Sequence, residues 1–274
     1  MKLETSPWLH ELSWPAIESY LQHDDIVIIP VGATEQHGRH TSMSVDTEWS
    51  IAVAEGAALQ AKVLTVPPIH FGWSPHHLAY PGAITLRPET LIDVLVDVGQ
   101  SLVYHGFKKL IFINGNRLAN HAPMEIAATK LRFQTGAFAS VVDVGLVARR
   151  EIAEICPTGQ TGHAGDIETS FMLHWRPELV DMSKAAAGSV HGGGPIAGHP
   201  MMLEPPFDLN AVTIRSTDVE LRAASAPTGI AGDARIATAE KGKAGLEAII
   251  RNTVMHIDQV RKIKVELKPT TIPI

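Results

Sequence analysis

Residues 26–40 read IVIIPVGATEQHGRH, an apolar run followed by glycine and then by polar side chains. The run Ile26–Val31 is short, continuous and rich in β-branched residues, which is typical of a strand buried on both faces. Residues Thr47–Leu59 then show an alanine-rich helical pattern. A buried strand followed by a helix is the first part of a β-α-β unit, so this stretch predicts a parallel sheet.

The same alternation of strands and helices extends to residue 144. Further strands are expected at Lys62–Val66, Lys109–Ile113 and about Ala139–Val144, and helices at Pro88–Tyr104 and about Ala122–Phe133. Strands separated by helices of this length predict an α/β fold with a mostly parallel central sheet covered on both faces.

The pattern changes after Cys156. A short helix is expected at Gly165–Trp175 and a final one from about Ala234 to Lys262. Between them, residues 185–232 are rich in glycine and proline and show little periodicity, which predicts a long irregular loop or an assembly arm. Because no internal repeat or linker divides the sequence, we expect a single domain over residues 1–274.

Composition limits the classes of function. Of the 274 residues, 45% are hydrophobic and 19% are charged, so a packed core is expected and disorder is not. The net charge of −6 argues against a nucleic-acid groove or a polybasic membrane patch. No apolar run reaches the ~18 residues that a membrane helix needs, and the acidic first 25 residues do not resemble a signal peptide. We therefore expect a cytoplasmic protein that acts on a small molecule.

Cysteine and histidine counts narrow the chemistry further. Cys156 is the single cysteine, which excludes an intramolecular disulfide and cysteine-rich metal sites. The chain has 14 histidines. A metal site would therefore consist of histidine and carboxylate ligands.

Polar side chains follow three of the expected strands. They are the segments 32–40 (GATEQHGRH), 70–77 (HFGWSPHH) and 114–117 (NGNR). Ligands of an open parallel sheet bind beyond the carboxyl ends of its strands, so these segments are the candidates for a site.

Glu35, His37 and Asp46 form the sharpest group. Residues i and i+2 of an extended segment point the same way, so Glu35 and His37 can face one centre. Carboxylate and imidazole together suit zinc or manganese, and Asp46 could bridge two ions ~3.5–4 Å apart. The alternative is that Glu35 and His37 are solvated loop residues.

Two further groups are candidates. His163 precedes Ala164 and Gly165, which would let a substrate approach closely, and Glu168 lies about one turn further along a predicted helix. His163 beside a metal-activated hydroxide would be a natural proton shuttle, although acidic residues at a helix start also have a purely structural explanation. The other group is the turn after His77, which could present His77 or Ser74 to substrate or be merely structural.

The ordered motifs resemble the creatininase (creatinine amidohydrolase) family. They are Val31-Gly32-x-Thr34-Glu35-Gln36-His37-Gly38 with Asp46, His77-x-x-Tyr80-Pro81-Gly82, Asn114-Gly115, His163-Ala164-Gly165-x-x-Glu168-Thr169-Ser170, Gly229-x-x-Gly232-Asp233 and Ala237-x-Ala239-Glu240-x-Gly242. The resemblance implies a three-layer α/β/α sandwich, one or two divalent ions (zinc or manganese), a homohexamer and hydrolysis of amide-type C–N bonds. It also implies that Glu35 and Asp46 bind one ion, that His37 and Asp46 bind the other, that Glu168 completes the site and that His163 is catalytic.

One position departs from the family pattern. The family has Asn-Gly-His after the third strand, and that histidine is a metal ligand, whereas this chain has Asn116. Leu118 stands where creatininase itself has a further glutamate ligand, which argues against creatinine as the substrate. The Asn116 amide oxygen could still ligate a hard ion, and His121 is a possible substitute. Trp73, Arg39 and Arg117 are further candidates to line a substrate pocket, together with His77.

These residues predict a metal-dependent hydrolase that cleaves an amide-type C–N bond in a small, polar, cyclic substrate. One alternative is a ring-opening C–C hydrolase that acts on an oxidised cyclic polyol, an inosose-type diketone. Another is a catalytically impaired binding protein, since Asn116 replaces an expected ligand.

Overall fold

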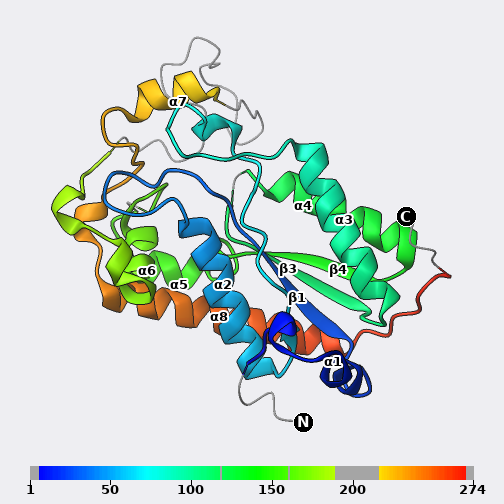
Figure 1. The fold of residues 1–274 in the computed structure, drawn as a ribbon. Helices are drawn as coiled ribbons and strands as arrows, with labels where there is room; N and C mark the ends of the chain where they lie inside the picture. Colours follow the sequence, from blue (N-terminus) through cyan, green and yellow to red (C-terminus); the bar gives the residue numbers. More distant parts are fainter. Residues whose placement is uncertain (1–5, 118, 160, 189–215, 270–274) are drawn as a thin grey trace, which may run out of the picture.

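The central element of the protein is a parallel β-sheet (Figure 1). The computed structural model describes residues 6–117, 119–159, 161–188 and 216–269. Within these residues the sheet has four strands in the order β2-β1-β3-β4. Their bounds are β1 Ile26–Val31, β2 Leu64–Thr65, β3 Lys109–Asn114 and β4 Phe138–Asp143. All three pairings are parallel, which confirms the predicted sheet.

Helices cover both faces of the sheet, so the architecture is the expected α/β/α sandwich. One face carries α2 (Val45–Ala61) and α8 (Ala239–Arg261), which pack against each other, and α6 (Asp166–Trp175) packs on α8. The other face carries α3 (Pro88–Tyr104) and α4 (His121–Thr135). Figure 1 shows the sheet between these two helical layers.

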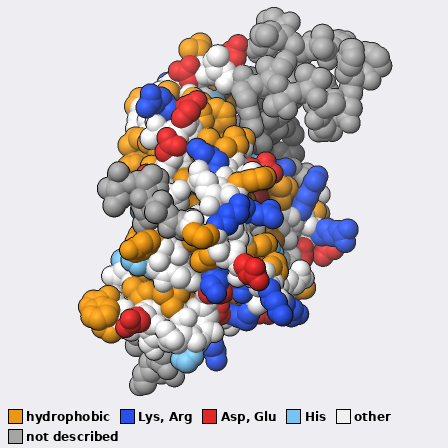
Figure 2. All heavy atoms as spheres, turned by 90° about the vertical axis from the view of Figure 1, so that its right-hand side faces the viewer, with side chains coloured by type: hydrophobic (Ala, Val, Ile, Leu, Met, Phe, Trp, Pro, Cys, Tyr) orange, Lys and Arg blue, Asp and Glu red, His pale blue; other side chains and the backbone are white. Residues whose placement is uncertain are grey.

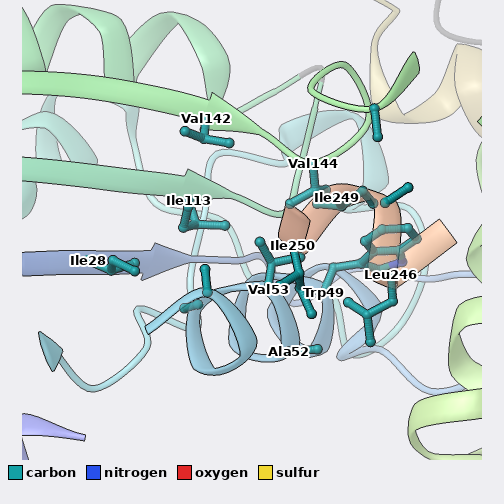
Figure 3. Close-up of a cluster of buried hydrophobic side chains, with 14 of the residues drawn as sticks. Ile28, Trp49, Ala52, Val53, Ile113, Val142, Val144, Leu246, Ile249 and Ile250 are labelled. Atoms are coloured by element: carbon teal, nitrogen blue, oxygen red, sulfur yellow. The ribbon is translucent and has the colours of Figure 1, made fainter. Parts of the chain in front are cut away.

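Alternating side chains of each strand supply the two cores. Ile28 of β1, Ile113 of β3 and Val142 of β4 point to the α2 and α8 side, where Figure 3 shows them with Trp49, Val53 and Ile249. Their neighbours Ile29 and Phe112 belong to the core on the α3 and α4 side. Strands with apolar side chains on both faces explain why β1 is a continuous rather than an alternating apolar run.

Several elements differ from the sequence-based expectation. The second strand spans only Leu64–Thr65, because only these residues pair with β1. Helices α1 (Trp14–Leu21) and α5 (Arg149–Ile155) were not predicted. The segment 185–232 is not irregular throughout: it contains helix α7 (Asp218–Ser225), which begins with a capping box formed by Thr217 and Glu220. Residues 189–215 of that segment lie outside the described residues.

Short 3₁₀ turns complete the described structure. They are η1 Leu9–Glu11, η2 Pro75–His77, η3 Pro177–Leu179, η4 Met182–Lys184 and η5 Ala234–Ile236. Because residues 234–236 form the turn η5, the predicted final helix begins later than expected, at Ala239. The Thr238 side chain is its N-terminal cap.

Strands β1 and β3 end level with each other at the point where the order of strands reverses. Val31 pairs with Asn114, and the chain leaves β1 toward β2 on one side and β3 toward β4 on the other. In open α/β sheets this switch point is where ligands bind. The loops after β1 and β3 therefore face each other at the expected place for a site.

Two glycines allow helix α2 to pack directly on these strand ends. A Cβ atom at Gly32 would lie 2.4 Å from Thr47 Cα, and one at Gly115 would lie 1.9 Å from the backbone oxygen of Asp46. Real Cβ atoms essentially never approach so closely, so both positions need glycine. Because these two glycines have no side chains, the start of α2 can approach the strand ends, and Asp46 lies at the switch point.

The surface in Figure 2 shows acidic and basic side chains interspersed among apolar ones. Within the described residues, no helix is both long and apolar enough to cross a membrane.

Candidate metal centre

The loop after β1 brings Glu35 and His37 into the protein interior. Glu35 is 3% exposed and His37 is 1% exposed, so neither is a solvated loop residue. Glu35 N–H donates to the Met43 carbonyl oxygen (3.1 Å), which folds the loop back toward the start of α2. Asp46, in the first turn of α2, is also buried. The structure thus brings the three residues of the sharpest predicted group together.

His37 is held in an orientation suitable for a metal ligand. Its Nδ1 lies 3.3 Å from the backbone oxygen of Glu35 and donates to it. This hydrogen bond places the lone pair on Nε2, in the manner by which ligand histidines are usually oriented. His37 Nε2 is buried and has no hydrogen-bond partner among the described residues.

Two carboxylate oxygens lie near His37 Nε2 at distances typical of atoms that share an ion. Asp46 Oδ1 lies 3.3 Å from it and Glu168 Oε2 lies 3.6 Å from it. Two ligand atoms that are each about 2.1 Å from a tetrahedral ion lie about 3.4 Å apart. Each carboxylate oxygen is therefore close enough to His37 Nε2 to share with it a divalent cation such as Zn²⁺ or Mn²⁺.

Glu168 reaches the centre from the start of α6. Its Oε2 accepts a hydrogen bond from Ala164 N–H (2.6 Å), within the turn that precedes the helix. Ala164 is fully buried and has a positive φ of 55°, a conformation that costs free energy for a residue other than glycine. The turn is thus held in a strained form that directs the Glu168 carboxylate toward His37.

His163 lies against the centre from the same turn. Its Nε2 is 2.7 Å from the backbone oxygen of Gln36, so this nitrogen carries the proton and donates it. Its Nδ1 faces Glu35 Oε1 at 3.8 Å, and its ring centroid is 4.4 Å from that of His37. The imidazole lone pair is therefore directed at the group of carboxylates.

His77 approaches Glu35 from the third predicted segment. It ends the turn η2, and its Nε2 lies 3.3 Å from Glu35 Oε1. The rings of His77 and His163 are 4.6 Å apart. Glu35 and His37 can hold a cation together with His163, and Glu35 can do so with His76 and His77.

Charge within the centre favours a bound cation. Burial and the Asp46 charge raise the pKa of Glu35 to about 8, and burial raises the pKa of Glu168 to about 7. Although burial alone would lower it, the charges of Asp46, Glu168 and Glu35 raise the pKa of His37 to about 10. Three carboxylates thus lie close to His37, and a bound cation would offset the repulsion between their charges.

The two remaining histidines are kept neutral. Burial, followed by the effects of neighbouring histidines, lowers the pKa of His77 to about 2. Burial and the nearby His37 and His77 lower the pKa of His163 well below its usual range. A neutral His163 can accept a proton, as a general base must.

Some predicted residues do not converge on the centre. Trp73 packs against the core on the α3 and α4 side. Arg117 is exposed, although its charge partly offsets the rise that burial causes in the pKa of Glu168 and of Asp143. His121 begins α4 and faces Glu125 (3.8 Å) and Asp143 (4.0 Å), so it does not substitute for the missing histidine. Leu118 lies outside the described residues.

Gln36 has a role that the sequence analysis did not identify. Its Nε2 donates to the Gly229 carbonyl oxygen (2.9 Å) and lies 2.9 Å from His163 Nε2 and 3.3 Å from His77 Nδ1. Gln36 therefore links the loop after β1 to the segment before α8 and buttresses both histidines. Its place between Glu35 and His37 was the available signal.

A cavity of about 420 Å³ adjoins Gln36. Its lining includes Arg39, Met43, Tyr80 and Arg222. Arg222 lies over the Tyr80 ring at 4.8 Å and donates to the backbone oxygen of Ala79. The two guanidinium groups make this cavity suitable for a small polar molecule with hydrogen-bond acceptors.

Comparisons with known proteins show the family to which the chain is similar. Residues 10–257 match the family model described as creatinine amidohydrolase. The 3-dehydro-scyllo-inosose hydrolase of Thermotoga maritima is 30% identical, covering 91% of this chain and 82% of the relative. Creatinine amidohydrolase of Pseudomonas putida is 28% identical, with 98% and 100% coverage. The mycofactocin precursor peptide peptidase of Mycobacterium ulcerans is 30% identical, with 89% and 85% coverage.

Solved structures show the same likeness. A crystal structure of creatinine amidohydrolase (creatininase) has a TM-score of 0.77 and 26% identity, covering 95% of this chain and 100% of that one. A Zn–Zn form and an Mn form of creatininase each have a TM-score of 0.76.

Proposed function

This chain belongs to the creatininase family, and on that premise we propose that it is a metal-dependent hydrolase of an amide-type C–N bond in a small polar, cyclic substrate. The observation that carries the proposal is the position of His37 Nε2, which is buried without a hydrogen-bond partner among the described residues and lies near the carboxylates of Asp46 and Glu168. A scaffold without chemistry has no need of such a group, because an unsatisfied buried nitrogen costs free energy.

His37, Asp46 and Glu168 would hold a divalent ion. Zinc and manganese are the candidates, since both suit imidazole with carboxylate and both occur in solved creatininase forms. When bound, such an ion supplies Lewis-acid chemistry: it acidifies water and polarises a carbonyl group.

The protein's own residues would position and move the proton. The backbone oxygen of Gln36 accepts a hydrogen bond from His163 Nε2, and the lone pair on His163 Nδ1 therefore faces the centre. His163 would take a proton at Nδ1 from the attacking water and pass it to the leaving nitrogen. Water is thereby added across the C–N bond, and the ring opens to one product that carries both a carboxylate and an amino group. Glu35 lies within 3.8 Å of this nitrogen and would stabilise the imidazolium that forms.

The cavity beside Gln36 supports a small polar substrate. We propose that Arg39 and Arg222 bind its oxygen substituents, and that His77, which lies next to Gln36, helps to orient it. Arg117, in the loop after β3, is a further candidate for substrate binding. Trp73 is a weaker candidate because it packs against the core.

The alternatives are not favoured. The family model and the solved neighbours describe amide hydrolysis, and the curated relatives are hydrolases, which speaks against a binding protein. One relative acts on an inosose, so the substrate test must include an inosose-type diketone.

The experiment combines metal analysis with a substrate panel. Purified protein is expected to contain zinc or manganese and to open cyclic amides to products that carry a free amino group. His163→Ala should lower kcat by at least 100-fold, a typical contribution of acid–base catalysis. His174→Ala, on the exposed side of the same helix α6, is the matched control and should retain activity. Metal-free protein, or full activity in His163→Ala, would refute the proposal; hydrolysis of the diketone alone would assign the C–C alternative.

We also propose a homohexamer and a cytoplasmic location. The family resemblance supports the assembly, and the free, buried Cys156 is compatible with a reducing compartment. Light scattering after gel filtration tests the assembly, and a mass of one chain, 29.6 kDa, would contradict it.

A further inference from the structure

Asn116 replaces a histidine ligand of the family, and its side chain has a defined orientation. The Oδ1 atom accepts a hydrogen bond from Ala119 N–H (3.1 Å). The Nδ2 atom donates to Glu35 Oε2 (2.8 Å) and to Asp46 Oδ2 (3.0 Å). Rotating the amide by 180° would lose the first bond and place an oxygen against two carboxylates. The amide nitrogen therefore faces the centre and the amide oxygen faces away.

This orientation removes Asn116 from the possible ligands. An amide nitrogen has no available lone pair, and its two protons are both used by the two carboxylates. Asn116 is 5% exposed and its backbone N–H is fixed by Asn114 Oδ1 (3.0 Å), so the amide has little freedom to turn.

The amide also occupies the place of a cation. Glu35 Oε2 and Asp46 Oδ2 both point at one atom, Nδ2, at 2.8 and 3.0 Å. An ion held by the same two oxygens at about 2.0–2.2 Å would meet the two amide protons. The N–H groups supply partial positive charge between two buried carboxylates, which is the electrostatic role that an ion would have.

The second part of the centre is unaffected by Asn116. Asp46 presents its other oxygen, Oδ1, to His37 Nε2 at 3.3 Å, and Glu168 lies on the side of His37. The Asp46 carboxylate thus faces the Asn116 amide with Oδ2 and the candidate ion site beside His37 with Oδ1.

We propose that the Asn116 amide takes the place of one metal ion, so that this chain has a mononuclear centre at His37, Asp46 and Glu168. The inference rests on the proposed metal-dependent function. Glu35 then becomes a hydrogen-bonded group between Asn116 and His77 and is not a ligand. Its role is to position these side chains and His163.

Metal stoichiometry tests this inference independently of activity. Metal-free protein is loaded with Mn²⁺, freed of excess by gel filtration and analysed by elemental mass spectrometry. One ion per chain is expected, with the electron paramagnetic resonance signal of isolated Mn²⁺. Two ions per chain with a spin-coupled signal would overturn the inference but leave the proposed function standing. Protein that binds no divalent ion would overturn both.

Two variants test the role of the amide. Asn116→His removes the pair of N–H donors and adds a ligand, and Asn116→Asp removes them with almost no change of shape. Each should raise the stoichiometry from one ion to two. Asn252→His, which adds an imidazole on α8 away from the centre, should remain at one. If Asn116→His does not fold, Asn116→Asp decides; if the folded variants bind a single ion, Asn116 does not exclude the second and the inference is wrong.

Discussion

Replacing Gly115 by alanine should weaken the metal centre without changing any proposed ligand. Gly115 directly follows β3, and its Cα lies under the first turn of α2. An added Cβ would lie 1.9 Å from the Asp46 backbone oxygen and 2.8 Å from the Asp46 carbonyl carbon. Both are backbone atoms, so no side-chain rotation relieves the overlap.

The required displacement sets the size of the effect. Ordinary contacts begin at 3.4 Å, so the start of α2 or the end of β3 must move by about 1.5 Å. Overpacking of this kind costs ~1–3 kcal/mol of unfolding free energy, or roughly 2–5 °C in Tm for a chain of this size. Asp46 moves with its backbone, and changes in the residues that support metal ligands lower metal affinity by about 10–100-fold.

Calorimetric titration of the metal-free protein with Mn²⁺, together with thermal unfolding, measures both effects. Gly145→Ala is the matched control, because its Cβ would meet only Arg117 Cδ at 3.1 Å and Asp143 Oδ1 at 3.4 Å, both on side chains. It should change Tm by less than about 2 °C, as for a site where neighbours can adjust. A Gly115→Ala protein with the Tm and the Mn²⁺ affinity of the unsubstituted chain would refute the packing argument.

Two further predictions concern residues behind the centre. Lys241→Met should lower the free energy of unfolding by about 3 kcal/mol, the lower end for a broken buried ion pair, because Lys241 Nζ contacts the fully buried Asp166 at 2.8 Å while 26% of the lysine side chain is exposed. Urea unfolding measures this loss, and a Lys241→Met/Asp166→Asn double variant that is destabilised as much as the single variant would contradict the pairing. Burial and the Asp166 charge raise the pKa of Cys156 to about 12, so the thiolate fraction at pH 8 is about 10⁻⁴ and becomes large only as the pH approaches 12. A disulfide reagent should label the native thiol at least 100-fold more slowly than the thiol of the urea-unfolded chain, and equal rates would show that Cys156 is accessible and ionised in the folded protein.

The central elements of the fold follow from local sequence patterns. Ile26–Val31 and Pro88–Tyr104 have the predicted bounds, since a β-branched run and a proline-started amphipathic pattern each determine their own ends. The strand at Leu64–Thr65 is shorter than its apolar pattern, because pairing with β1, not propensity, decides where it ends. Helix α7 was detectable from Thr217 and Glu220 at capping-box spacing, but the surrounding glycine and proline content obscured this signal.

The candidate site divides in the same way. Glu35 and His37 at i and i+2 after a strand were predictable as a pair, and the structure brings both together with Asp46, His163 and Glu168. The orientation of Asn116 was not predictable. Sequence shows that an amide replaces an imidazole, but which end of the amide faces the carboxylates depends on the N–H of Ala119, three residues later in a loop.

The sheet makes position 116 decisive for the centre. Because Val31 and Asn114 are paired at the ends of β1 and β3, a side chain two residues beyond β3 must meet the loop that carries Glu35. Gly115 lets α2 approach from the same side, so the same side chain also meets Asp46. In this chain, the residue at 116 therefore lies between two buried carboxylates. It must supply either a ligand for an ion or hydrogen-bond donors in place of one, because two buried carboxylates without either would repel each other. If the proposed centre is correct, a change in metal content can arise from one substitution at this position, while the fold and the proposed ligands His37, Asp46 and Glu168 stay the same.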